Sequence, residues 1–420
     1  MKKVALSLAG VLAAAAFAPE ASAIPAFARQ TGMACSACHA QHFPILNGFG
    51  RAFKAAGFTM MGAQEKVEGE HLSIPATMNL GVLLKVRYQK SNGTASATLP
   101  DGATTNHGQW QFPDEYAFFI GGRVADNGAT KVGVMMENAL GGTDAGIAAG
   151  LRVPVVYEMD AAKLSVIPFT TDGLGPFYGY SESSAGVVRS IRWAEHRNEI
   201  SAHQYTGMGS NAATGFAFVA HTDMGYINVT RYSPLFASNL AQKSTAVHAA
   251  FTPTIGDFAT IFSVEALSGT ADIADNSGFA LDATDGTINP ATEGLAKVPT
   301  KGTGFSAQAH GELAGMETGF YFQNSKVDKG SYAGDKVLTG EKTATTIGAD
   351  FTVIPHVLSL GAAIRSAKNN NVSDNATTFT AVYDLAQNVA VVANYTKYSD
   401  KALQSHGGDN LLTMMLEAAW

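Results

Sequence analysis

The chain ends with the stretch LLTMMLEAAW, residues Leu411 to Trp420, in which every second side chain is apolar. Successive side chains of a β-strand point to opposite faces, so this alternation predicts a strand with one apolar face. The members of that face are Leu412, Met414, Leu416, Ala418 and Trp420. An ordinary amphipathic strand has the same periodicity, so the neighbouring sequence must decide what kind of sheet this strand completes.

The same alternation recurs from about Leu80 onwards. In Gly215 to His221 it places Phe216, Phe218 and Ala220 on one face and Ala217, Val219 and His221 on the other. Gly, Asn, Asp and Pro separate the segments, and Asp126-Asn127-Gly128 is a hairpin turn signal. The other predicted strands are Gly81 to Tyr88, Glu115 to Val124, Thr130 to Asn138, Arg152 to Met159, Ala162 to Thr170, Val187 to His196, Ile200 to Tyr205, Gly225 to Arg231, Thr245 to Thr252, Asp257 to Leu267, Gly304 to Leu313, Glu317 to Gln323, Thr345 to Val353, Leu358 to Arg365, Thr377 to Tyr383 and Val389 to Tyr395.

These segments predict about 16 to 18 strands, a number typical of a porin-sized barrel. Charged residues make up only 15% of the chain, which is low for a soluble protein but suits a wall with one lipid-facing side. Outer-membrane barrels commonly end on an aromatic residue, and the polar stretches Ser91 to Asn106 and Thr270 to Lys301 fit extracellular loops. We therefore expect an all-β transmembrane barrel of about 16 antiparallel strands. A soluble β-sandwich or propeller is the alternative, but the sequence has no repeat of propeller length.

The first 23 residues have the features of a cleaved secretory signal. Lys2 and Lys3 precede an apolar run, and Ala21-Ser22-Ala23 is a small-residue cleavage site. No later stretch has the roughly 20 consecutive apolar residues of a membrane-spanning helix. The net charge of -7, without any long basic block, gives no reason to expect nucleic acid as a partner. The expected location is the outer membrane of a Gram-negative bacterium.

The two cysteines of the chain lie in the sequence Cys35-Ser36-Ala37-Cys38-His39. This is the C-x-x-C-H signature of covalent c-type haem attachment. One helical turn presents both thiols to the two vinyl groups of the porphyrin, and the adjacent His39 is placed to bind the iron as proximal ligand. A thioredoxin-type disulfide would need a βαβ setting, which is missing here, and a zinc site would need a second pair of ligands.

The sixth haem ligand is less well defined by the sequence. His42 follows His39 on the same helical face and can hardly reach the opposite side of the ring. Met60 is the first choice, with Met61 beside it, because a short helix over Asn47 to Phe58 could fold back over the haem. His71 is the alternative, and simple packing of either methionine on the haem is also open.

The segment from Ile24 through Cys38-His39 to Lys54, with His42-Phe43-Pro44 and Asn47-Gly48-Phe49-Gly50-Arg51 inside it, resembles the fused monohaem cytochrome–porins of the outer membrane. The best-described members of that family are iron oxidases of iron-oxidising bacteria. The resemblance implies one covalent haem c held by Cys35, Cys38 and His39 in a plug seated in or under the barrel. It also implies electron transfer from extracellular Fe(II) to a periplasmic cytochrome or other carrier. Arg29 and Lys54 are candidate partners of the haem propionates, although exposed, solvated charges are the commoner interpretation.

The expected organisation is a signal peptide over 1–23, a small α-helical monohaem cytochrome segment over 24–75 and the barrel over 76–420. The expected activity is electron transfer of the Fe(II):cytochrome oxidoreductase type. Two alternatives stay open. One is a general electron conduit without an iron-oxidising site, and the other is a porin in which the haem segment is a structural plug.

Overall fold

A computed structural model of the chain describes residues 25–41, 45–62, 64–94, 104–139, 149–181, 200–208, 211–237, 241–272, 280–281, 288–289, 297–334, 336–399 and 408–420. The predicted signal peptide, His42 and the predicted strand Val187 to His196 lie outside these residues. No described helix is long and apolar enough to cross a membrane.

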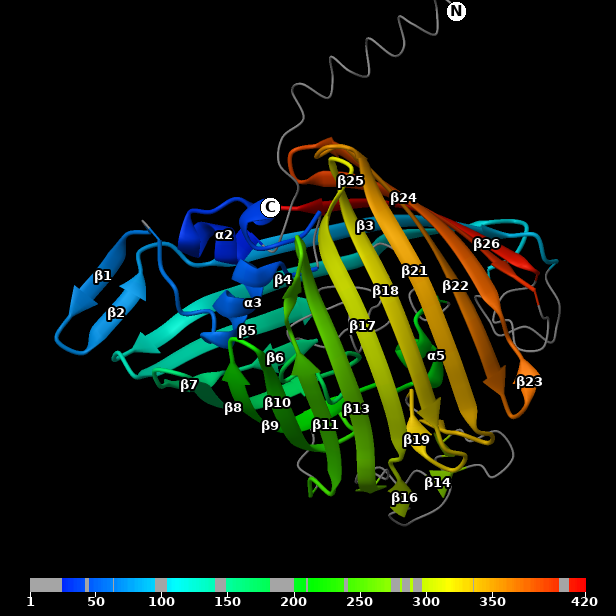
Figure 1. Cartoon of the computed structure of the whole chain (residues 1–420), viewed down its shortest axis with the longest axis horizontal. Helices are drawn as coiled ribbons and strands as arrows, with labels where there is room; N and C mark the ends of the chain where they lie inside the picture. The colour runs from blue at the N-terminus through cyan, green and yellow to red at the C-terminus, as the bar shows by residue number, and fades with distance from the viewer. Residues whose placement is uncertain are drawn as a thin grey trace, which may run out of the picture.

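Most of the described strands join into one closed antiparallel barrel, which confirms the predicted fold class (Figure 1). Within the described residues the wall has sixteen strand positions, because β6 and β7 occupy one position together. The wall strands are β3 (Leu80–Ser91), β4 (Gln109–Asp126), β5 (Thr130–Ala139), β6 (Gly150–Arg152) with β7 (Val155–Glu158), β8 (Lys163–Thr171), β9 (Ala213–Thr222), β10 (Gly225–Ser233), β11 (Ser244–Phe251), β13 (Phe258–Asp272), β17 (Gly302–Leu313), β18 (Met316–Val327), β21 (Lys342–Ile354), β22 (Leu358–Asn369), β24 (Ala376–Ala386), β25 (Val389–Tyr398) and β26 (Asn410–Ala419).

Shorter strands accompany this wall. Those that extend it are β12 (Thr254–Ile255), β16 (Lys297–Pro299) and β23 (Val372–Ser373). Three two-stranded pairs lie outside it, namely β1 (Lys66–Gly69) with β2 (Leu72–Pro75), β14 (Ala280–Leu281) with β15 (Ile288–Asn289), and β19 (Tyr332–Ala333) with β20 (Lys336–Val337). Pro154 separates β6 from β7, since proline has no N–H to donate to a neighbouring strand.

The C-terminal stretch closes the barrel. β26 pairs with β3 from Leu411 opposite Ser91 to Ala419 opposite Leu83, and the backbone of Trp420 exchanges hydrogen bonds of 2.8 and 3.0 Å with Val82. The predicted apolar row faces outward, because Met414, Leu416 and Trp420 are 41 to 47% exposed while Leu411 is buried. The exposure of these side chains therefore confirms that the predicted apolar face of the strand points outward.

The two faces of the wall differ in chemistry in the same way around the ring. Large apolar side chains such as Phe218, Val264 and Ile347 are exposed on the outside. Polar side chains such as Asn228 and Thr346 point inward and are buried. A wall of this kind needs an apolar medium around it and tolerates a polar lumen, as in transmembrane barrels.

The connections of the barrel are short at one end and long at the other. The turns after β4, β9, β17, β21 and β24 lie at the end where β3 begins and β26 ends, and we call it the terminus end. In the β4–β5 turn Gly128 has a φ of +90°, and its N–H donates to Asp126 Oδ1 over 3.0 Å, as the sequence signal predicted. The longer connections, including 92–108 and 172–212, leave from the opposite loop end.

Residues 172–181, 200–208 and 211–212 are the described part of the connection from β8 to β9, and we call them the lumen segment because they pack against the inner face of the wall. This segment contains α5 (Ala202–Thr206), so the prediction of a strand over Ile200 to Tyr205 was wrong. Ser201 Oγ accepts the Gln204 N–H at the start of this helix, and Gly207 ends it in the left-handed conformation with a φ of +81°. These caps outweigh the weak alternation that suggested a strand. Figure 1 shows α5 inside the ring of strands, where it contacts β18 and β21.

Candidate functional site

The N-terminal segment is docked on the barrel wall at the terminus end (Figure 1). Its helix α2 (Pro25–Thr31) lies against β3 and β4, where glycines allow close approach. A β-carbon at Gly81 would lie 2.8 Å from Pro25 Cδ, and one at Gly121 would lie 2.8 Å from Phe27 Cε1. These glycines make a shallow seat for α2 on the inner face of the wall.

Gln30 fastens this seat with its buried side chain. Its Nε2 donates to the carbonyl oxygens of Phe58 and Met60 over 2.6 and 2.8 Å. Its Oε1 accepts from Asn79 Nδ2 over 3.2 Å and from the Arg123 N–H over 3.1 Å. One fully buried amide therefore joins α2, the 58–60 stretch and β4, and all its hydrogen-bonding groups are satisfied.

Cys35 begins one tight turn, η1 (Cys35–Ala37), Cys38 follows it directly, and both side chains are half-buried. The N–H groups of Cys38 and His39 donate to the Cys35 carbonyl oxygen over 3.1 and 3.0 Å. Burial and the nearby Cys35 raise the pKa of the Cys38 thiol above its ordinary value. Because the Cys38 N–H bonds to the Cys35 carbonyl oxygen, the turn brings the two cysteines close together, as attachment to one porphyrin edge would require.

Asn47 and Gly50 hold this turn from the other side. The Asn47 Nδ2 donates to the carbonyl oxygens of Ser36 and Ala37 over 3.3 and 3.0 Å, while its Oδ1 accepts the Gly50 N–H at the start of α3 (Gly48–Ala55). The helix predicted over Asn47 to Phe58 is therefore present, although shorter. A β-carbon at Gly50 would lie 2.1 Å from the Cys38 carbonyl oxygen, so only glycine fits at this contact.

His39 has a defined orientation in this segment. Its Nδ1 lies 3.2 Å from the Ile45 carbonyl oxygen, which can only accept, so Nδ1 carries the proton. The lone pair is then on Nε2, the atom that a proximal haem ligand uses. Together with the two thiols, this donor set suits a covalently attached haem c.

The candidate distal ligands differ in their surroundings. Met60 packs against the apolar cluster around Phe53 and Phe58, and Met61 is half-buried beside it. His71 is 92% exposed at the tip of the β1–β2 hairpin, which projects from the terminus end in Figure 1. Met60 and Met61 are thus partly shielded from solvent and His71 is not, and which of them binds the iron stays a prediction.

The two cations considered for the propionates both contact the backbone. Arg29 donates to the Leu80 carbonyl oxygen, and Lys54 donates to the Ser181 carbonyl oxygen. The Lys54 ammonium also lies 6.0 Å from the centre of the Tyr180 ring. Arg29 is exposed, whereas Lys54 is half-buried and ties α3 to the lumen segment.

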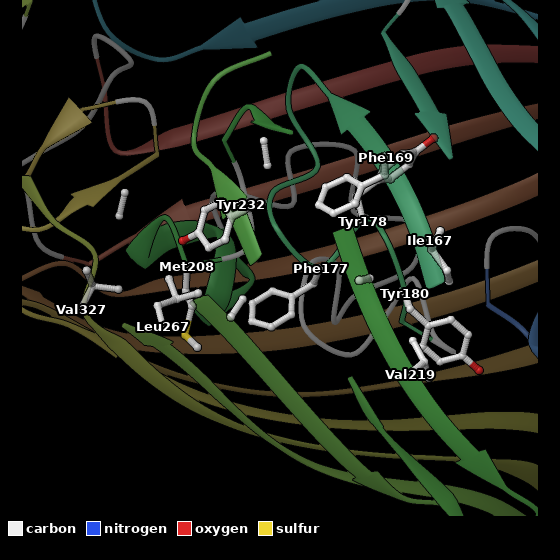
Figure 2. Close-up of a cluster of buried hydrophobic side chains, with 14 of the residues drawn as sticks. Ile167, Phe169, Phe177, Tyr178, Tyr180, Met208, Val219, Tyr232, Leu267 and Val327 are labelled. Carbon is white, nitrogen blue, oxygen red and sulfur yellow. The ribbon is translucent and has the colours of Figure 1, made fainter. Parts of the chain in front are cut away.

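The lumen segment contacts both the N-terminal segment and the wall. On one side Tyr178 covers Arg152 of β6, whose guanidinium lies 4.9 Å from the Tyr178 ring and 5.2 Å from the Phe58 ring. Figure 2 shows Tyr178 beside Phe169, Tyr180 beside Val219 and Met208 beside Leu267, all members of one apolar cluster that also includes Phe177. These rings fill that part of the lumen with apolar surface.

The helix α5 of the lumen segment is fixed by further contacts to the wall strands β13, β18 and β22. The Tyr205 hydroxyl donates to Asp374 Oδ2 over 2.8 Å, and the Arg365 guanidinium lies 4.0 Å from the ring centre. Thr206 and Ser325 share a hydrogen bond of 2.7 Å. His203 Nε2 lies 3.4 Å from Glu265 Oε2 with both side chains fully buried. Sequence reasoning missed this arrangement because the residues involved are far apart along the chain.

Among the residues that support the Cys turn, Asn47 carried a readable signal and Gln30 did not. Asn before Gly and a helical run is a typical N-cap, so the start of α3 is readable from the sequence. Gln30 resembles any polar residue of a short helix, and only the fold brings it to Asn79 and Arg123.

Comparison with known proteins identifies the fold. No family model and no curated protein matches the sequence. Among solved structures, a loop L8 deletion mutant of OmpT, an outer membrane protein of Vibrio cholerae, matches with a TM-score of 0.51 and 12% identity over 82% of this chain and 99% of that chain. A mutant of the Rh. blastica porin matches with a TM-score of 0.51 and 11% identity over 82% of this chain and 100% of that chain. The chain therefore has a porin-like barrel fold.

Proposed function

We propose that this chain is an outer-membrane barrel that carries one haem c in its N-terminal segment and passes electrons from an extracellular donor to a periplasmic carrier. The observation that carries the proposal is the Cys35–His39 turn, held by Asn47 and Gly50 at the terminus end of a closed barrel. A redox group in that place would lie at one end of the barrel, towards one side of the membrane.

The placement in a membrane rests on the surface of the wall. Exposed apolar side chains cover its outside and buried polar ones its inside, which is the arrangement that lipid requires. Barrels of the outer membrane have short periplasmic turns and long extracellular loops. By this rule the terminus end, with the Cys35–His39 turn, faces the periplasm.

Each residue of the site would have a separate task. Cys35 and Cys38 would form the thioethers, His39 would be the proximal ligand through Nε2, and Met60 would be the distal ligand. The haem supplies one-electron chemistry when bound. Gln30 and Gly50 keep α2 and α3 in place, so the ligands stay in position while an electron enters and leaves.

Fe(II) is the donor suggested by the sequence resemblance. Each Fe(II) would give up one electron and leave as Fe(III), and the periplasmic carrier would be reduced by the same electron. Anaerobic mixing of the oxidised, haem-loaded protein with Fe(II) tests this, because haem reduction should follow rapidly. A haem that is reduced by dithionite but not by Fe(II) would instead support a conduit for another donor.

A diffusion porin with a structural plug is the second candidate, and its support is the fold shared with porins. The filled lumen speaks against wide diffusion, since lumen-facing Asn228, Gln323 and Thr346 are almost fully buried. Liposome swelling distinguishes the two candidates. Sugar uptake as fast as that of an open 16-stranded porin would favour the diffusion porin, whereas little uptake together with haem reduction would favour electron transfer.

A further inference from the structure

The orientation of His39 depends on the backbone carbonyl group of Ile45. The Ile45 carbonyl oxygen accepts from His39 Nδ1 over 3.2 Å and from the Ala40 N–H over 3.0 Å. The hydrogen bond between His39 Nδ1 and the Ile45 carbonyl oxygen is therefore kept only if the Ile45 backbone stays in place. The Ile45 side chain is fully buried, so its packing holds this part of the backbone in place.

Ile45 packs in an apolar cluster that includes Ile200 of the lumen segment and wall residues such as Tyr321. Ile200 is itself fully buried. Its carbonyl oxygen accepts a hydrogen bond from the Thr346 hydroxyl of β21, and the next residue, Ser201, donates its hydroxyl to Gln323 of β18 over 2.9 Å. Ile200 is thus fastened to the wall on one side and in contact with the Ile45 cluster on the other.

We propose that Ile200 is a positioning residue for the proximal haem ligand. It packs in the same apolar cluster as Ile45 and is anchored to the wall, so that the cluster holds Ile45 in place and the Ile45 carbonyl keeps its hydrogen bond with His39 Nδ1. The inference rests on the proposed haem and adds that the lumen segment, remote from the Cys turn in sequence, sets the properties of the iron. A hydrogen bond of this kind makes a ligating histidine more basic and stabilises the oxidised iron. A looser Ile45 should therefore raise the reduction potential.

The test is Ile200→Ala in the full-length, haem-loaded protein, with Ile200→Val as a milder variant. Met208→Ala is the matched control, because Met208 is also fully buried in the lumen segment but packs in a different cluster. Spectroelectrochemical titration should show an upward shift of the midpoint potential in Ile200→Ala, a smaller one in Ile200→Val and none in Met208→Ala. Low-temperature EPR of the oxidised protein should show altered g values in the same order.

An unchanged potential and unchanged g values in folded Ile200→Ala would overturn the inference, as would equal shifts in Met208→Ala. Barrel folding is checked by heat-modifiable migration on a gel, and if Ile200→Ala does not fold, the shift in Ile200→Val decides. The pyridine haemochrome of the unmutated protein is measured separately. A protein with haem but without the Ile200 effect would refute only this inference, whereas a protein without haem would refute the proposed function as well.

Discussion

Gly50 touches the carbonyl group of Cys38 so closely that a β-carbon at position 50 would lie 2.1 Å from its oxygen. The contact places α3 directly on the C-x-x-C-H turn. It connects the shape of the turn to the rest of the N-terminal segment, and the haem proposal depends on that shape.

The first prediction concerns this contact. Gly50→Ala should push α3 away from the turn, at a cost of about 1–3 kcal/mol for overpacking, and lower the haem content several-fold. Gly48→Ala is the control, since a β-carbon there would meet only Arg51 Nη2, at 4.0 Å. Haem per protein, measured on purified barrels, checks this. Equal haem content in both variants would show that the contact does not shape the attachment site.

The second prediction concerns the distal ligand. Met60→Ala should abolish the methionine-to-iron charge-transfer band of the oxidised protein and lower its potential, because a thioether ligand favours reduced iron. Met61→Ala serves as the neighbouring comparison and should keep the band. A band that survives in Met60→Ala but disappears in Met61→Ala would show that Met61, and not Met60, is the distal ligand.

The barrel was largely predictable from the sequence because its wall obeys a local rule. Phe216 and Phe218 alternate with Ala217 and Val219, and this period of two depends on neither loop lengths nor distant residues. The Cys35–His39 motif was equally local. Whether it binds haem stays a prediction.

The interior was not predictable, because distant residues build it. Ile200 to Tyr205 has a short apolar and polar alternation, and its helix forms where Ser201 caps it and Tyr205 reaches Asp374 across the lumen. His203 and Glu265 meet 3.4 Å apart although one lies in α5 of the lumen segment and the other in the wall strand β13. No local pattern encodes such pairs, since each depends on the closed ring of strands.

The third prediction addresses the lumen segment. Tyr205→Ala removes the contacts of the ring and hydroxyl with Arg365 and Asp374, so α5 should loosen and sugar uptake into liposomes should rise several-fold. Tyr205→Phe, which loses only the hydroxyl, should give a smaller increase. The outward substitution Ile347→Ala should leave uptake unchanged. Uptake by Tyr205→Ala equal to that of the unmutated protein would mean that α5 does not restrict the lumen.

The fourth prediction tests the lipid-facing surface. Ile347 lies in the middle of β21 and is 61% exposed, whereas Val353 lies near its end on the same face. Ile347→Lys should destabilise the folded barrel by about 2–4 kcal/mol if this position faces the bilayer midplane, and Val353→Lys by about 0–1 kcal/mol near the interface. Denaturant unfolding in lipid vesicles measures both. Equal small effects would indicate that water surrounds this face.

The pyridine haemochrome spectrum of the purified, detergent-extracted protein, together with its intact mass, shows whether haem is attached covalently to Cys35 and Cys38. We expect one haem per chain, which stays attached on denaturation in the unmutated protein and is lost from the double variant Cys35→Ser with Cys38→Ser. A protein from a host competent in c-type cytochrome maturation that shows no haemochrome and no added haem mass would contradict it.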